Sequence, residues 1–118
     1  LKQKLAEMES ETLETFTDRV QKKLFQLIPS GQSSLENVVE EFGISTRTVQ
    51  RNLAVENIKF NQIVKSVQKI MAFNYLESKE LSIEEIAYLV GYTETSSFYR
   101  AFKGWIGKTV LQYRKEKE

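Results

Sequence analysis

The chain has 118 residues, 41% of them hydrophobic, and a formal net charge of +1. This length suits one domain or two very small domains that share a core, and no run of about 18 apolar residues marks a membrane segment. Cysteine and histidine are absent, which excludes disulfides, thiolate or imidazole metal ligands, and catalysis by a cysteine–histidine or serine–histidine pair. We therefore predict no catalytic residue, metal or cofactor. Without a secretory signal, the expected location is the cytoplasm.

Apolar residues recur at helical spacing, and a single proline with five glycines leaves little room for β-turns. The fold class is therefore predicted to be all-α. A first amphipathic helix is expected from about residue 12 to 28, and residues 1–10 either continue it or form a frayed tail. Its apolar face could form a dimer seam, pack against this domain, or pack against another domain. That face comprises Leu13, Phe16, Val20, Leu24 and Leu27.

A helix, a glycine turn and a second helix are expected after the break at residues 29–32. Ser34 can cap the first helix by accepting a bond from a free amide, and Gly43 suits the left-handed conformation that ends a helix. Ser45 caps the second helix, which runs to about Val55, and Asn57 is the expected stop. The predicted buried residues are Leu35, Val38, Val39, Phe42, Ile44, Val49 and Leu53.

A long linker helix is expected from about Phe60 to Ser78. At about 1.5 Å per residue it would be a rod of about 27 Å that holds its two neighbours a fixed distance apart. Lys65 and Lys69 on this helix are interpreted as solvated. The predicted apolar face comprises Phe60, Ile63, Val64, Val67, Ile70, Met71 and Tyr75.

A second helix–turn–helix is expected after the linker helix. Ser82 and Glu85 have the spacing of a capping box, and Gly91 ends the helix that they begin. Thr93 or Thr95 is the expected cap of the following helix, which stops at Gly107. Its aromatic residues recur at helical spacing and are interpreted as core rather than as a base-stacking platform. These residues are Phe98, Phe102 and Trp105.

A short last helix completes the predicted fold. Thr109 is its expected cap, and Val110 and Tyr113 anchor it to the core. From Arg114 onward the charged residues are expected to extend into solvent. We divide the chain into an N-terminal helix segment (1–32), a first helix–turn–helix (33–58), the linker helix (59–80), and a second helix–turn–helix with the C-terminal helix (81–118).

The two helix–turn–helix segments read as copies of one pattern. Ser34 corresponds to Ser82, and Gly43 to Gly91, at an offset of 48 residues in both cases. After the glycine the offset is 49, so that Arg51 corresponds to Arg100. Such a duplication predicts two contacts with one DNA duplex, because the second helix of each unit stands out from the body and can enter a major groove.

The outward faces of the two second helices carry the candidate base contacts. Arginine and glutamine can each form two hydrogen bonds to a purine edge. The first copy has more such side chains, so we expect it to read bases more sharply than the second, which relies more on phosphates and DNA shape. The candidates are Arg47, Gln50 and Arg51 in the first copy, and Thr95, Ser96, Tyr99 and Arg100 in the second.

Candidate contacts to the DNA backbone lie at helix starts and among further polar side chains, because free amides at a helix start bind phosphate oxygens. Arg100 has an alternative role as an arginine bonded to a helix end within the core. The predicted backbone contacts are Ser34, Ser82 and Thr109 at helix starts, with Thr46, Thr48, Lys103 and Lys108.

Two other classes of function stay open at this point. A near-neutral helix–turn–helix unit could bind another protein instead of DNA, although acidic first helices and basic second helices can hide local basic surfaces in a balanced total. An enzyme with carboxylate or lysine chemistry is disfavoured because the chain has no histidine, cysteine or glycine-rich loop.

The second half resembles the DNA-binding domain of the AraC/XylS family of bacterial transcription regulators, and the first half agrees. The similar stretch covers about residues 33 to 114. Gly104 and Val110 depart from the family pattern, since members usually have a larger residue and a proline there. The residues that carry the resemblance are Ser34-Leu35, Phe42-Gly43-Ile44-Ser45, Arg47-Thr48-Val49-Gln50-Arg51, Ile86-Ala87, Val90-Gly91-Tyr92, Ser96, Phe98, Arg100-Ala101-Phe102-Lys103, Gly107, Thr109 and Tyr113-Arg114.

The resemblance implies a fold of about seven helices in which two helix–turn–helix units are joined by a long helix. It implies sequence-specific binding along one face of double-stranded DNA, base contacts from the positions proposed above, and activation through RNA polymerase. The first residue is not methionine, so we expect a fragment of a longer regulator whose N-terminal sensor or dimerisation domain precedes it.

Overall fold

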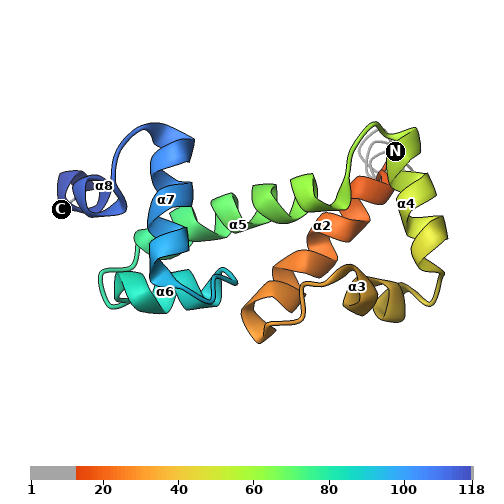
Figure 1. Ribbon diagram of the computed structural model, residues 1–118, viewed down its shortest axis with the longest axis horizontal. Helices are drawn as coiled ribbons and strands as arrows, with labels where there is room; N and C mark the ends of the chain where they lie inside the picture. The colour runs from red at the N-terminus through yellow and green to blue at the C-terminus, as the bar shows by residue number, and fades with distance from the viewer. Residues whose placement is uncertain (1–12, 118) are drawn as a thin grey trace, which may run out of the picture.

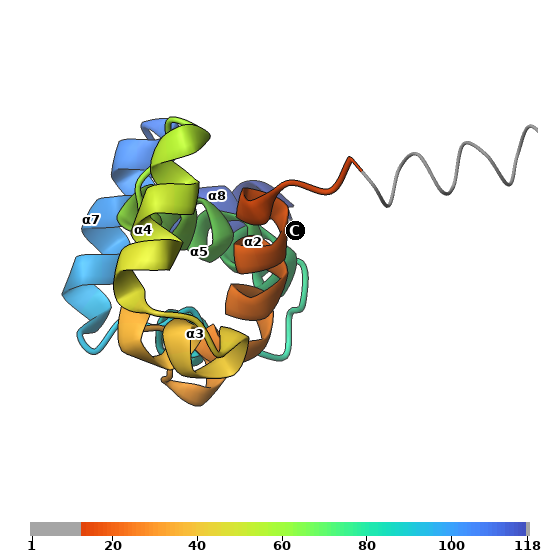
Figure 2. The same ribbon diagram turned by 90° about the vertical axis from the view of Figure 1, so that its right-hand side faces the viewer.

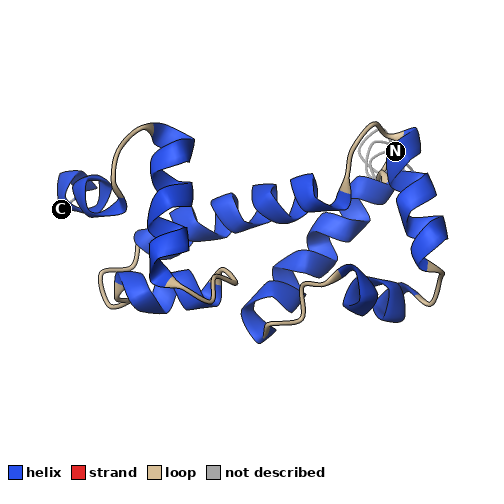
Figure 3. Ribbon diagram, in the orientation of Figure 1, coloured by secondary structure: helices blue, strands red, loops and turns tan. Residues whose placement is uncertain are grey.

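The computed structural model describes residues 13–117, and within this range helices joined by loops and turns form the structure, without strands (Figures 1 and 3). Its principal dimensions are 45 × 38 × 24 Å. The all-α prediction is therefore confirmed. The elements are α2 (Phe16–Leu27), the short 3-10 helix η1 (Ile28–Ser30), α3 (Leu35–Phe42), α4 (Thr46–Val55), α5 (Phe60–Leu76), α6 (Ile83–Leu89), α7 (Thr95–Ile106) and α8 (Val110–Lys117).

Helix α2 begins later than the sequence predicted. Thr15 caps it by accepting a hydrogen bond from the amide of Asp18, whose carboxylate accepts one from the Thr15 amide. This reciprocal cap fixes the start at Phe16. Leu13 lies before the helix and is 75% exposed, so its predicted place on the buried face is wrong. The prediction for residues 1–10 lies outside the described residues.

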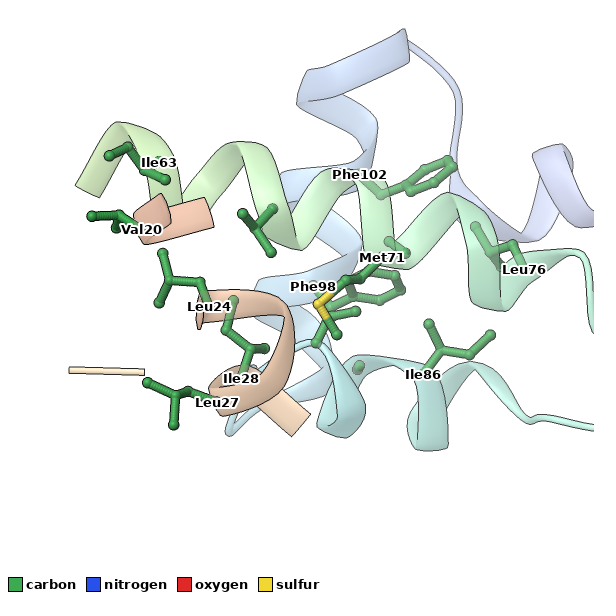
Figure 4. Packing of buried hydrophobic residues seen from close by; sticks show 14 of the residues in the cluster. Val20, Leu24, Leu27, Ile28, Ile63, Met71, Leu76, Ile86, Phe98 and Phe102 are labelled. Atoms are coloured by element: carbon green, nitrogen blue, oxygen red, sulfur yellow. The ribbon is translucent and has the colours of Figure 1, made fainter. Parts of the chain in front are cut away.

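The apolar face of α2 packs against this domain, which answers the question that the sequence left open. Val20, Leu24 and Leu27 are buried. They face α3, α4 and α5, while η1 reaches α6. The buried residues of all these elements form one continuous cluster (Figure 4). The proposed boundary at residue 33 stays a prediction, although α2 shares this core with the helices that follow it.

Helix α5 runs through both halves of the core. Ile63 and Val67 are buried in its first part, and Met71, Ala72 and Leu76 in its second part. Ile70 is 46% exposed, so its predicted burial is wrong. The reason is that the buried face turns along the helix, because α2, α6 and α7 pack on α5 from different sides.

Most of the predicted helix caps are confirmed. The Ser34, Ser45 and Ser82 hydroxyls each accept a hydrogen bond from the backbone amide three residues on. Gly43 and Gly91 adopt positive φ angles of 66° and 92°. The Gly91 backbone also lies close to η1 and α5, where an added Cβ would sit 3.4 Å from atoms of Ile28 and Gln68.

The predicted cap of α7 is wrong. Neither Thr93 nor Thr95 is the N-cap: Glu94 occupies that position and makes no capping bond with its side chain. Thr95 is instead the first residue of the helix. Counted from the glycine to the start of the next helix, the second turn (Gly91 to Thr95) is one residue longer than the first (Gly43 to Thr46), in keeping with the change of offset from 48 to 49 in the duplicated pattern.

Glu56, directly after α4, holds the start of α2. Its carboxylate accepts hydrogen bonds from the Phe16 and Thr17 amides, both at 3.0 Å, and from the Thr17 hydroxyl at 2.5 Å. The hydroxyl bond is the largest cause of a lowered pKa for Glu56, followed by the Thr17 amide bond. A carboxylate at the positive end of a helix stabilises it. Glu56 thus ties the end of one helix to the beginning of another.

We expect Glu56→Ala to lower the free energy of unfolding by about 1 kcal/mol, as the loss of a helix cap does. Because the pKa of Glu56 is lowered on folding, the stabilisation is complete above the ordinary glutamate pKa of about 4.3 and is lost as the pH falls through the lower folded value. Urea unfolding at several pH values measures this difference. Glu80→Ala, at an exposed loop glutamate, is the control, and equal effects of the two substitutions would contradict the assignment.

Candidate DNA-binding interface

The second helices of the two helix–turn–helix units, α4 and α7, lie on one side of the molecule. In Figure 1 both stand upright near opposite ends of α5, and in Figure 2 both lie to the left of α5, with α2 to its right. Both units thus present their outward helices in the same direction. This arrangement is the one that two contacts along one face of a duplex require.

Helix α4 presents its long polar side chains outward because Val49 and Leu53 are buried beneath it. Arg47, Gln50 and Arg51 are exposed, and the two arginines form no ion pair within residues 13–117. The structure therefore brings the three candidate base contacts of the first copy together on one free surface.

Thr46 and Thr48 belong to the first turn of the same helix. Thr46 is exposed, whereas Thr48 is half-buried and its hydroxyl lies 2.8 Å from the Ser45 hydroxyl. The two threonines are therefore not equivalent as candidate phosphate contacts, because the Thr48 hydroxyl already takes part in the cap.

Helix α7 presents a shorter, more hydroxylic face. Phe98 and Phe102 are fully buried beneath it. Ser96 and Arg100 are exposed, and Thr95 and Tyr99 are half-buried. The candidates of the second copy therefore also share one face, but only Arg100 among them carries a charge. This difference agrees with the expected inequality of the two copies.

The aromatic residues of α7 form part of the core, as predicted. The Phe98 and Phe102 ring centroids are 6.2 Å apart, and Trp105 lies 5.8 Å from Phe102. Phe73 of α5 and Tyr113 of α8 each approach Phe102 to 5.4 Å. Rings arranged in this way hold α7 on α5 and α8. They offer no exposed platform for stacking bases.

For Arg100 we considered the role of an arginine that bonds to the backbone within the core. In the structure Arg114 has this role. Its Nη2 donates to the backbone carbonyl of Ser78 at 2.9 Å and to that of Leu81. The prediction that Arg114 extends into solvent is wrong. Its partners lie 36 and 33 residues away in a loop, and no local pattern indicates such a pairing. Arg100 is exposed and forms no ion pair in the described range.

The predicted backbone contacts differ in their availability. The Ser34, Ser82 and Thr109 hydroxyls each accept a capping hydrogen bond from a backbone amide, which leaves the hydroxyl hydrogen free to donate to a phosphate. Lys103 is exposed on α7. Lys108 is paired with Glu116 at 2.6 Å, which makes it a weaker candidate than Lys103.

Two further features were sought among the described residues: a cluster of metal ligands and a membrane-spanning helix. No three histidine, cysteine or acidic residues between residues 13 and 117 lie together as a metal site would require. None of the described helices combines the length and the apolar character needed to cross a membrane.

Comparison with known proteins gives the class of this structure. A family model described as "Helix-turn-helix domain" matches residues 38–116. The C-terminal domain of AraT, a response regulator from Geobacillus stearothermophilus, superimposes with a TM-score of 0.70 at 31% identity, over 86% of this chain and 84% of that one. A DNA-binding transcriptional dual regulator from Escherichia coli K-12 has a TM-score of 0.81 over 87% of this chain and 92% of its own. Its 20% identity shows the fold alone.

Curated relatives specify the family. The HTH-type transcriptional regulator VirS of Mycobacterium tuberculosis is 34% identical over 100 residues, which are 85% of this chain and 29% of VirS. The HTH-type transcriptional activator FapR of Escherichia coli is 33% identical over 99 residues, or 84% of this chain and 38% of FapR. The chain thus spans about a third of the length of these relatives.

The fold and these matches define a helix–turn–helix domain of transcription regulators. The chain belongs to the AraC-type helix–turn–helix family, which confirms the resemblance found in the sequence. DNA-binding transcription regulation is accordingly the function of this class of domain.

Substitutions of Arg114 and Arg100 should affect different properties, the first the stability of the fold and the second the binding of DNA. We expect Arg114→Ala to lower the free energy of unfolding by about 2 kcal/mol, because two carbonyls lose a charged donor. Arg100→Ala should change stability by less than about 0.5 kcal/mol, since the residue is exposed, yet weaken binding to a duplex. Urea unfolding and fluorescence anisotropy measure the two effects. The reverse pattern would show that the roles are exchanged.

Proposed function

We propose that this chain binds a specific operator through two recognition helices, α4 and α7, inserted into successive major grooves on one face of the duplex. The observation that carries the proposal is the common orientation of these two helices on one side of the molecule (Figure 2). Long donors exposed on α4 and hydroxyl groups on α7 support base reading concentrated in the first unit. The second unit then contributes phosphate contacts and response to DNA shape.

Selection from random duplexes tests operator recognition directly. We expect an enriched motif with two parts about one helical turn apart, and an affinity that falls steeply as salt rises. A protein-interaction module would enrich no motif. That outcome would overturn the proposal.

In the longer protein we propose two partners. RNA polymerase would receive the regulatory output, and a sensor or dimerisation domain would precede the segment described here. Both follow from membership of the family, of whose curated relatives VirS and FapR this chain matches 29% and 38% of the length. Pull-down of RNA polymerase by the full-length, operator-bound protein tests the first.

Substitutions on the two recognition helices should distinguish the residues that contact bases from those that contact phosphates. We expect Gln50→Ala or Arg51→Ala to relax preference at particular base pairs, at a cost of about 1–3 kcal/mol each, because a bidentate contact is lost. Lys103→Ala should weaken all sequences alike, because phosphates are the same in every sequence. Binding of each variant to a panel of single-base operator changes distinguishes the two effects. A uniform loss from all three variants would refute this division.

The length of α5 predicts bent DNA in the complex. Its 17 residues give a rod of about 26 Å, whereas major grooves on one face of straight DNA repeat every 34–36 Å, roughly. Since α4 and α7 are held by this helix at its two ends, we expect the duplex to curve toward the protein when both insert. Energy transfer between dyes at the duplex ends should increase on binding. A duplex that stays straight while both half-sites are protected would contradict the prediction.

A further inference from the structure

Two lysines lie between the recognition helices. Lys65 and Lys69 stand one turn apart on α5, are both exposed, and form no ion pair with any residue of the described range. Their neighbours Gln62 and Ser66 are exposed and polar as well. The middle of α5 therefore has an open polar face that packing within the chain does not explain.

Helix geometry indicates the direction of this face. Phe73 packs on Phe102 and Trp105 of α7, at ring-centroid distances of 5.4 and 6.4 Å, and on Tyr113 of α8 at 5.4 Å. Ile63 and Val67, by contrast, are on the buried side of α5 that packs on α2. Lys69 lies one turn before Phe73, and residues four apart share a side of a helix. The side of α5 on which α7 packs is the side on which α4 also lies, opposite α2 (Figure 2). Lys69 thus points in the direction of the recognition face, and Lys65 flanks it one turn earlier.

The distribution of charge sets the same face apart. Helices α4, α5 and α7 each carry two cationic residues and no carboxylate, whereas α2 and α8 carry three cations each together with a carboxylate. The first helix of each helix–turn–helix unit is acidic, with three glutamates in α3 and two in α6. The net charge of +1 therefore conceals a run of six cations over three helices. Among these three helices, α5 is the one to which the proposed base contacts assign no function.

We propose that α5 is a third DNA-contact element, in which Lys65 and Lys69 bind phosphates that border the minor groove between the two occupied major grooves. This inference rests on the proposed operator binding and adds a contact to it. The minor groove between two successive major grooves faces the protein midway between α4 and α7. Two ammonium groups there neutralise phosphates on the inner side of the duplex, which lowers their mutual repulsion and favours curvature toward the protein. Such contacts position the duplex without reading its sequence.

The salt dependence of operator binding tests the contact. Each phosphate contact contributes about 0.9 to the slope of log affinity against log salt, so Lys65→Gln/Lys69→Gln should reduce the slope by about 1.8. Between about 50 and 200 mM salt, the wild type should then lose about tenfold more affinity than the double variant. Lys79→Gln, in the α5–α6 loop that Figure 2 draws on the side away from α4 and α7, is the matched control. An unchanged slope, or an equal reduction in the control, would overturn the proposal.

A second experiment locates the contact on the DNA. Replacing the central phosphates of the selected operator by neutral methylphosphonates should weaken the wild type relative to the double variant. The double variant has no lysine contact to lose there, so its affinity should stay the same or rise, because neutral phosphates also favour curvature. Equal losses in both proteins would overturn the α5 contact. If the lysine substitutions have no effect in either experiment while Arg51 still determines the preference at its base pair, the α5 contact is wrong and the proposed operator binding is unaffected. Failure to select any operator would instead count against the proposed function.

Discussion

The shared burial of α5 is the constraint on which the arrangement of the two reading units depends. Its first part is packed against α2 through Ile63 and Val67, and its second part against α6 and α7. Gln68 adds a hydrogen bond of 2.9 Å to the carbonyl of Val90, at the turn of the second unit. Helix α5 is thus part of the hydrophobic core of both helix–turn–helix units. A close-packed core transmits such a placement rigidly, so the direction of α4 is defined relative to that of α7.

The N-terminal helix strengthens the same constraint from the other side. Helix α2 packs on α5, α3 and α4, while η1 touches α6. Glu56 fixes the start of α2 to the end of α4, and Arg19 lies over the Phe16 and Phe42 rings at 5.7 and 5.3 Å. The segment through which the chain enters the domain is therefore in direct contact with the end of a recognition helix.

Features fixed by neighbouring residues could be read from the sequence, whereas those fixed by distant partners could not. The caps at Ser34, Ser45 and Ser82 and the glycine turns were predictable because the groups involved lie within a few residues. The outward direction of Arg47, Gln50 and Arg51 followed from the helical period of the buried residues. The roles of Glu56 and Arg114 depend on partners more than 30 residues away. The exposure of Ile70 depends on which helices cover α5, which periodicity alone does not specify.

The segregation of charge explains how a nearly neutral chain can suit a polyanionic partner. Electrostatic attraction to DNA falls off over a screening length of about 8–10 Å at moderate salt. Phosphates close to α4, α5 and α7 would therefore experience those six cations more strongly than the glutamates of α3 and α6 on the first helices of each unit. The same acidic helices disfavour approach of DNA from other directions, because like charges repel. A low net charge combined with carboxylate-free helices on the proposed DNA-binding side thus favours a single binding orientation over general attraction to nucleic acid. This is the property that a domain with two recognition helices on one side requires.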